Sequence, residues 1–194
     1  MSEVVVDITM SLDGFVTGPD AGPSNGLGDG GEPLHRWVFE DDDVDKEILR
    51  TSVDRSGAVI LGRNLFDVVD APDGWNDDMG YGAEHAARPP MFVVTHRPPA
   101  EARLPFWTFV GSVEAAVEQG KAAAGDKDVF AMGGGHVIRQ ILALGLADRI
   151  QIHLAPLVLG GGTPLFESGS PVPLEQVGVR VSPFATHLAY VPTS

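Results

Sequence analysis

The sequence reads Asp128-Val-Phe-Ala-Met-Gly-Gly-Gly-His-Val-Ile-Arg-Gln-Ile-Leu-Ala-Leu-Gly145 over the stretch that decides the fold. An apolar run from Val129 to Met132 predicts a buried strand, and three glycines follow it. Apolar residues then recur at helical spacing from Val137 to Leu142, and Gly145 is placed to end that helix. A strand, a glycine turn and a helix start suit a phosphate group, because glycine admits a ligand close to the backbone and a helix N-terminus favours an anion. The same glycines would also serve only to turn a strand tightly into a helix, so both interpretations stay open here.

Length and composition indicate one soluble globular domain. The 194 residues suit a single domain over residues 1–194 rather than two. Thirteen basic against 27 acidic side chains give a net charge of -14, so neither nucleic acid nor an anionic membrane is expected as a partner. The sequence contains no cysteine, which excludes disulfides, a thiolate nucleophile and a cysteine-ligated zinc ion.

Signals for secretion and membrane insertion are missing from the sequence. The first residues lack the basic and long apolar regions of a signal peptide, and no run of about 18 apolar residues occurs. We therefore expect a cytoplasmic protein. The histidines are scattered, so we expect no metal site.

The order of apolar runs predicts an α/β domain. Strands that alternate with helices and then end as a pair imply a sheet that is parallel at first and antiparallel at its final edge. Strands are expected at residues 4–10, 57–61, 91–95, 106–110, 129–132, 149–155, 177–181 and 185–191. Helices are expected from Asp42 or Asp43 to about Asp54, with Val44, Ile48, Leu49 and Val53 facing inward, then at 65–69, from the Ser112 cap to Ala124, and after the glycine turn.

Two loop regions interrupt this pattern, at residues 18–33 and 70–90. Both are rich in glycine and proline, and loops this long in a compact domain are often functional. Residues 26–31 match the dinucleotide fingerprint G-x-G-x-x-G, but no strand leads into them and Pro33 follows, so the match is rejected. We expect the two loops to form a lid and a wall of the substrate site.

Three predicted strands end in small or basic residues. These ends are Gly62-Arg63-Asn64, Thr95-His96-Arg97 and Gly133 to His136. In an open α/β sheet, ligands bind beyond the carboxyl ends of the strands. Three such ends that converge on one crevice would hold an adenosine phosphate and a pyrophosphate.

Four segments of the sequence resemble the dihydrofolate-reductase-like superfamily. They are Ser11 to Gly18, Gly62-Arg63, Met132 to Val137 and Leu146 to Phe166, in the expected order. The sequence is most similar to the C-terminal reductase domain of the riboflavin-biosynthesis bifunctional deaminase-reductases and to their stand-alone relatives. The resemblance implies a mostly parallel central sheet with antiparallel C-terminal edge strands and helices on both faces. The deaminase half, whose zinc signature requires cysteines, is not expected in this chain.

The resemblance also implies NADPH as the cofactor. Arg63 corresponds in position to the arginine that pairs with the 2′-phosphate, for which its planar fork is suited. A plain surface arginine is the alternative. Thr95, His96 and Arg97 would flank the adenine ribose, while Thr9 and Val16 would contact the carboxamide end. The full expected cofactor set is Thr9, Val16, Gly62, Arg63, Asn64, Leu65, Thr95, His96, Arg97, Gly133, Gly134, Gly135, His136 and Val137.

The implied activity is that of a 5-amino-6-(5-phosphoribosylamino)uracil reductase, with hydride transfer to a pyrimidine or pteridine-type substrate. The candidates for the carboxylate that supplies a proton are Glu40, Asp41 and Asp43, and the candidates for substrate contact are Asp13 and Arg36. Dihydrofolate reductase activity and a non-catalytic NADPH sensor are the alternatives. Relatives are commonly homodimers, so we expect a homodimer that associates through the late strands.

Overall fold

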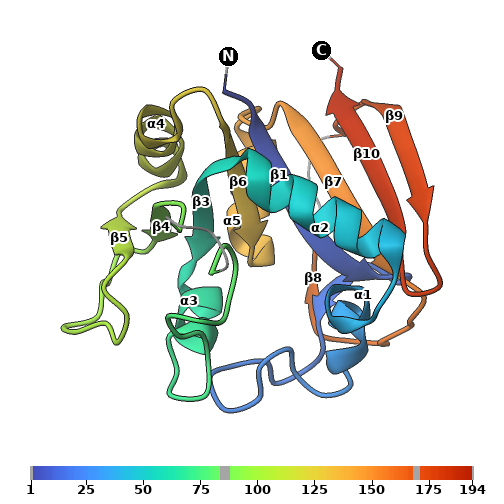
Figure 1. Ribbon diagram of the computed structural model, residues 1–194, viewed down its shortest axis with the longest axis horizontal. Helices are drawn as coiled ribbons and strands as arrows, with labels where there is room; N and C mark the ends of the chain where they lie inside the picture. Colours follow the sequence, from blue (N-terminus) through green and yellow to red (C-terminus); the bar gives the residue numbers. More distant parts are fainter. Residues whose placement is uncertain (1, 84–87, 168–170, 194) are drawn as a thin grey trace.

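The computed structural model describes residues 2–83, 88–167 and 171–193. Within these ranges the chain forms an eight-stranded sheet in the order β5-β4-β3-β6-β1-β7-β10-β9, and a small second sheet of β2 and β8 (Figure 1). The elements are, in chain order, β1 (Val4–Ser11), β2 (Phe15–Thr17), η1 (Glu32–His35), α1 (Arg36–Phe39), α2 (Asp43–Arg55), β3 (Ser56–Gly62), α3 (Arg63–Val69), β4 (Met91–Val94), β5 (Trp107–Val110), α4 (Val113–Ala124), β6 (Asp128–Gly133), α5 (Gly135–Ala143), β7 (Arg149–Ala155), β8 (Thr163–Pro164), β9 (Leu174–Val181) and β10 (Thr186–Pro192).

The direction of the strands confirms the predicted sheet. From β5 through β7 every neighbouring pair is parallel, and β10 is antiparallel to both β7 and β9. The glycine-turn strand β6 lies in the middle, with Val4 of β1 and Ala58 of β3 both opposite Val129. The parallel strands are apolar runs because helices cover both of their faces.

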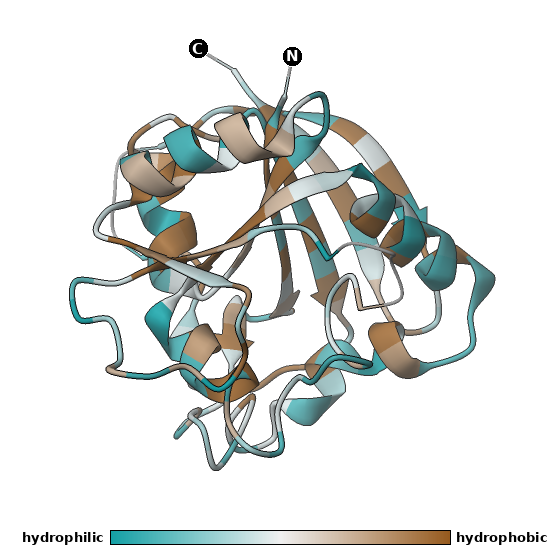
Figure 2. Ribbon diagram, turned by 60° about the vertical axis from the view of Figure 1, so that its left-hand side comes forward, coloured by the Kyte–Doolittle hydropathy of each residue, from teal (hydrophilic) through white to brown (hydrophobic). Residues whose placement is uncertain are grey.

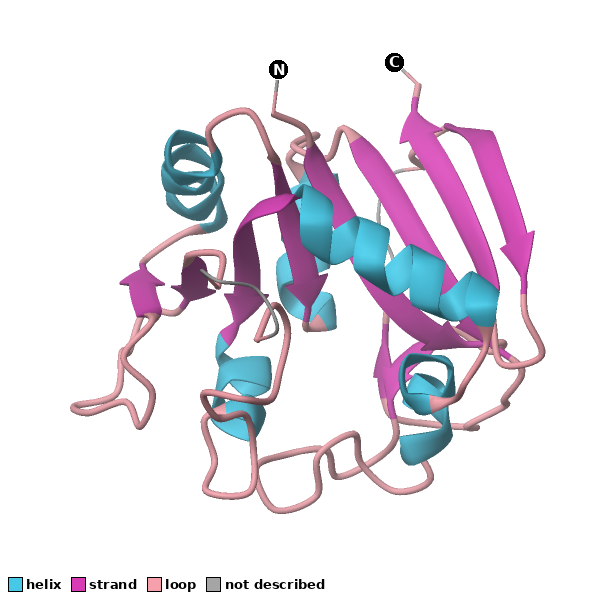
Figure 3. Cartoon of the chain, in the orientation of Figure 1, coloured by secondary structure: helices cyan, strands magenta, loops and turns pink. Residues whose placement is uncertain are grey.

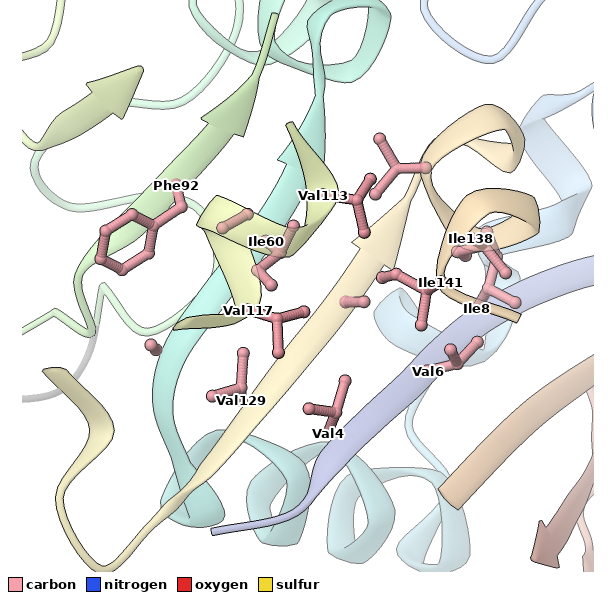
Figure 4. Packing of buried hydrophobic residues seen from close by; sticks show 14 of the residues in the cluster. Val4, Val6, Ile8, Ile60, Phe92, Val113, Val117, Val129, Ile138 and Ile141 are labelled. Atoms are coloured by element: carbon pink, nitrogen blue, oxygen red, sulfur yellow. The ribbon is translucent and has the colours of Figure 1, made fainter. Parts of the chain in front are cut away.

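Alternate residues of the central strands belong to two separate cores. Ala58 and Ile60 of β3 pack with Val129 beneath α4 and α5, in the cluster that Figure 4 shows. Val59 and Leu61 face the other way and pack with the aromatic residues around α3. Figure 2 shows the hydrophobic stretches running along the strands, while the helices are banded in hydrophobic and hydrophilic residues. No helix in the described ranges is long and apolar enough to cross a membrane.

Helix α2 begins and ends as the sequence predicts, but its buried face is different. The Asp42 side chain caps it by accepting hydrogen bonds from the backbone N–H groups of Val44 and Asp45, at 2.9 and 3.3 Å. The four apolar residues expected to face inward are only partly buried, whereas Asp45 and Ser52 are buried. The prediction of an apolar inner face was therefore wrong, because buried Ser52 and Asp45 of this helix bond to polar side chains of β1 and β10.

The two expected loop regions lie at one end of the sheet. Figure 3 shows the long connections gathered at the carboxyl ends of β1, β3 and β6, opposite the two chain termini. The first loop is shorter than expected, because η1 already begins at Glu32. Its glycines meet backbone closely: a Cβ on Gly18 would lie 2.1 Å from the carbonyl oxygen of Asp29. Strand β2 pairs with β8. This pairing joins the first loop to the second run of glycines in the chain, residues 160–162.

We expect Asp42→Ala to lower the free energy of unfolding by about 0.5–2 kcal/mol, because two N–H groups at the start of α2 lose their acceptor. Asp42→Asn is the matched control, since its amide oxygen still accepts. Urea unfolding of both variants measures the difference. Equal stability of Asp42→Ala and the wild type would contradict the assigned cap.

Candidate functional site

One large cleft lies at the carboxyl ends of the central parallel strands. It has a volume of about 1640 Å³ and is lined by parts of β1, β3, β4, β6 and α2 and by both long loops. That volume exceeds the roughly 300–1,000 Å³ of an ordinary small-molecule pocket. The three strand ends singled out in the sequence all reach it, through Gly62, Thr95 and Gly134.

The ends of β3 and β6 meet at glycines. Leu61 pairs with Gly133, whose φ of +116° is a conformation that side chains rarely adopt. A Cβ on Gly62 would lie 2.9 Å from Cγ2 of Val137 and 3.6 Å from the backbone nitrogen of Gly134. The missing side chains therefore leave bare backbone facing the cleft. No side chain caps the N-terminus of α5, which begins at Gly135 in this wall.

Arg63 connects the ends of β3 and β4. Its Nε donates to Oδ1 of Asp67 at 2.7 Å, and Nη1 donates to the carbonyl oxygen of Arg97. The guanidinium also lies over the ring of Phe66, 5.7 Å from its centroid. The side chain is 35% exposed and lines the cleft. A cation held in this way is oriented before a ligand arrives, which suits a phosphate monoester.

The cofactor residues expected from the sequence fall on this cleft, except for Arg97 and Gly133. Arg97 contributes its backbone instead: its N–H donates to Oγ1 of Thr95 at 3.1 Å, which shapes the turn after β4. Thr9 and Val16 lie on the opposite wall from Arg63, at the ends of β1 and β2. The structure thus brings the expected residues together, and their contacts with a cofactor stay a prediction.

The three candidate acids lie outside the cleft lining. Glu40, Asp41 and Asp43 are exposed. Glu40 pairs with Arg36 at 3.2 Å, and Asp41 pairs with Lys46. This placement favours a proton donor elsewhere in the chain.

The two candidate substrate contacts are engaged elsewhere. Arg36 pairs with Glu40 and lies over the ring of Phe184. The carboxylate of Asp13 accepts from Ser11 Oγ at 2.6 Å and from the N–H groups of Leu159 and Gly160 at 3.1 and 2.7 Å. These hydrogen bonds, that of Ser11 first, lower the pKa of Asp13 to about 2. Asp13 therefore fastens the second glycine run, residues 160–162, to the turn between β1 and β2.

A set of polar residues that the sequence analysis missed forms the wall behind Thr9. Trp37 donates from Nε1 to Oγ1 of Thr9 at 2.9 Å, and its ring lies 4.2 Å from that of His153 and 5.2 Å from that of His187. Asp7, two residues before Thr9 on the same face of β1, also lines the cleft. The available signal was the polar alternation of residues 7, 9 and 11 within a buried strand.

Behind Asp7, three hydrogen bonds join four ionisable side chains into one chain. His153 Nε2 lies 3.0 Å from Asp7 Oδ1, the two Nδ1 atoms of His153 and His187 lie 2.7 Å apart, and His187 Nε2 lies 2.7 Å from Asp45 Oδ1. The side chain of Asp7 is 13% exposed, whereas that of Asp45 is 0% exposed. Across the described residues, no group of three acidic or histidine side chains is arranged to hold a metal ion.

Comparisons with known proteins agree with this geometry. The family model of the RibD C-terminal domain matches residues 2–188. The chain is 26% identical over 169 residues to the uncharacterized protein YyaP of Bacillus subtilis, covering 84% of this chain and 79% of that protein. The fold is similar to that of dihydrofolate reductase from Enterococcus faecalis, solved with NADP(H), with a TM-score of 0.62, 15% identity and coverage of 99% and 97%.

The fold is also similar to a diaminohydroxyphosphoribosylaminopyrimidine deaminase/5-amino-6-(5-phosphoribosylamino)uracil reductase from Thermotoga maritima. The TM-score is 0.61 at 16% identity, over 99% of this chain and 57% of that one. This chain therefore spans little more than half of that two-activity protein.

We expect the contribution of Asp13 to the stability of the protein to depend on pH. Because its folded pKa of about 2 lies below the ordinary value of 3.8, this stability is fully present above pH 3.8 and is lost as the pH falls towards 2. Asp13→Asn removes this dependence, so the stability difference between wild type and variant should shrink between pH 5 and pH 3. Chemical denaturation at each pH measures it, and a constant difference would contradict the role.

Proposed function

Because this chain belongs to the RibD C-terminal domain family, we propose that it is an NADPH-dependent reductase of a C=O or C=N bond. The observation that carries the proposal is the convergence of Arg63, the turn after β4 and the bare glycine backbone of β6 on one cleft. A guanidinium fork suits the 2′-phosphate, and exposed backbone N–H groups suit a pyrophosphate. Both groups occur together in NADPH.

The residues present fit that cofactor. A Cβ at Gly62 would fill the space between β3 and the start of α5, so the glycine keeps open the cradle in which the pyrophosphate would lie. Arg63 would hold the 2′-phosphate, and Thr95 and His96 would flank the ribose. Thr9 and Val16 would then meet the nicotinamide end near Trp37. Bound NADPH would supply a hydride, while the protein orients both reactants and excludes water.

The substrate we propose is a pyrimidine with an attached phosphoribosyl group, or a related pteridine-type heterocycle. The reductase activity in the name of the Thermotoga maritima protein supports this class. The cleft volume of about 1640 Å³ is large enough for a second molecule beside a dinucleotide. Turnover of such a substrate would separate an enzyme from the alternative of a non-catalytic NADPH sensor, and turnover of dihydrofolate would favour the other alternative.

The first test is a calorimetric titration with NADPH and with NADH. Arg63→Ala should weaken NADPH binding tenfold or more, because losing a charge-assisted contact costs about 1.5–3 kcal/mol. NADH binding should change little, since NADH lacks the 2′-phosphate. Arg180→Ala is the matched control, since Arg180 pairs with Glu47 outside the cleft. If neither nucleotide binds the wild type, the proposed function is wrong.

We further propose that the protein is a homodimer that associates through β9. This strand ends the sheet, and it exposes Leu174, Val177, Val179 and Val181 by 42–65%. Edge strands are normally protected by charge or by a covering element, so an apolar edge favours a second copy as its cover.

Replacing both Val179 and Val181 with lysine should therefore convert a wild-type dimer into a monomer. Light scattering coupled to gel filtration measures the mass of each form. Val158→Lys is the control, because it also adds charge at an exposed apolar residue but lies outside β9. A monomeric wild type would contradict the proposed dimer.

A further inference from the structure

The buried chain from Asp7 to Asp45 has a proton count that its geometry fixes. Two ring nitrogens 2.7 Å apart repel each other unless a proton lies between them, so the two Nδ1 atoms share one. Each carboxylate contact, at 3.0 and 2.7 Å, holds one more. Three hydrogen bonds therefore contain three protons. Two neutral imidazoles beside two ionised carboxylates would hold only two, so the chain stores one extra proton.

The extra proton can be placed at either end of the chain. If each shared proton moves across its own hydrogen bond, the carboxylic acid changes from Asp45 to Asp7, and the net charge of the four groups stays at minus one. The far end is enclosed, because Asp45 Oδ2 is buried without a hydrogen-bond partner among the described residues. Only Asp7 lines the cleft. The extra proton can therefore pass between the chain of hydrogen bonds and the cleft through Asp7.

The surroundings keep the chain to a single extra proton. Burial lowers the pKa of His187, and nearby His153 lowers it further, while the carboxylates of Asp45 and Asp7 oppose the shift. Burial and His153 likewise lower the pKa of His35 to about 4. The groups facing Asp7 are His153 from β7, the Ser52 hydroxyl of α2 at 3.2 Å, and Tyr81 of the second loop. Burial first, and then Asp7, raise the pKa of Tyr81, so its phenol stays neutral.

We propose that Asp7 is the proton donor of the reduction, supplied by the extra proton held between His153, His187 and Asp45. This inference rests on the proposed reductase function, which lacks an acid once Glu40, Asp41 and Asp43 lie outside the cleft. Asp7 projects from β1 two residues before Thr9, on the same face. Because Thr9 is expected beside the nicotinamide, the acid would lie next to the bond that is reduced.

The proposed step balances in atoms and electrons. Hydride brings two electrons to the carbon of the C=O or C=N bond, with NADPH oxidised to NADP⁺, and the π pair moves to the oxygen or nitrogen. That atom takes the proton of the Asp7 carboxylic acid, and Asp7 becomes a carboxylate. The four groups then hold two protons among three contacts until water resupplies the third after product leaves.

A structural role is the alternative, because the chain also ties α2 to β1, β7 and β10. That role needs the same three hydrogen bonds and their three protons, but it needs no access to the cleft and no transfer of a proton. The two roles therefore differ in what the reaction rate and its pH profile measure. Asp7→Asn suits the comparison, since an amide keeps the shape and can still accept from His153.

The proton count can be measured without any substrate. In protein labelled with ¹⁵N-histidine at pH 7, NMR should detect three labile protons in these hydrogen bonds, one on Nδ1 between the two rings and one in each contact between a ring Nε2 and a carboxylate. His187→Gln assigns the proton between the rings by removing it. Two Nδ1 atoms without a proton would overturn the proposal, whether or not the reductase function is correct.

The donor role is measured by NADPH oxidation with 5-amino-6-(5-phosphoribosylamino)uracil. Asp7→Asn should lower kcat by about 100-fold or more, as loss of general acid catalysis does, and should leave the Kd for NADPH within about twofold. Glu47→Gln, the same change of charge on an exposed face of α2, should leave both values unchanged. Wild-type kcat in a folded Asp7→Asn protein would overturn the donor role.

Asp45 acts through the histidines, so its effect is expected on the pH profile. Activity requires the protonated chain and falls as the pH rises through its apparent pKa. Asp45→Asn removes a negative charge that stabilises the extra proton, so this fall should move to lower pH while NADPH binding is unchanged. An unmoved profile would overturn the relay. A wild type that fails to bind NADPH would instead contradict the proposed function, and the NMR measurement would still decide the proton count.

Discussion

Parallel pairing of β3, β6 and β1 is the constraint on which the rest of the structure depends. Strands that run in one direction end at the same edge of the sheet. Residues far apart in the sequence are therefore brought to that edge by the strands, and they need no contact with one another. The pairing holds only because both faces are covered: α4 and α5 close one face with an apolar core, and α3 closes part of the other. The remaining part, over β1 and β7, is closed by α2 through polar side chains. The proposed proton donor, Asp7, lies in that part of the sheet.

Under α2, hydrogen bonds between ionisable side chains take the place of a buried apolar surface. A helix over a sheet normally buries an apolar stripe, and leaving Asp45 inside without its histidine would leave a buried charge unpaired. His187 satisfies one of its oxygens, and His153 and Asp7 continue the chain to the cleft. Such a network is tolerable only when its protons match its hydrogen bonds. The same three hydrogen bonds therefore stabilise this side of the protein and hold the one extra proton.

Sequence reasoning succeeded where the signal was local. Ser112 and Gly125 bound α4 as predicted, and the glycine run after β6 turns the chain into α5. The convergence of strand ends follows from strand direction alone, so the sequence predicts one crevice at these ends, and Gly62, Thr95 and Gly134 do line one cleft. The prediction of the proton donor did not follow the same pattern. The carboxylates at the start of α2 were candidates because they lie close together in the sequence, but charged residues at a helix start are mostly solvated.

The polar chain escaped prediction because its members carry no mutual signal in the sequence. Asp7 and His153 are 146 positions apart, and His187 and Asp45 are 142 apart. The pairing of β1 with β7 and of β7 with β10 puts His153 opposite both Thr9 and His187, and Asp7 lies two residues before Thr9 on the same face of β1. A histidine in the middle of a buried strand is a weak signal alone, but two in adjacent paired strands must either share a proton or repel. Strand register therefore decides the chemistry here, and register is the quantity that local patterns specify least.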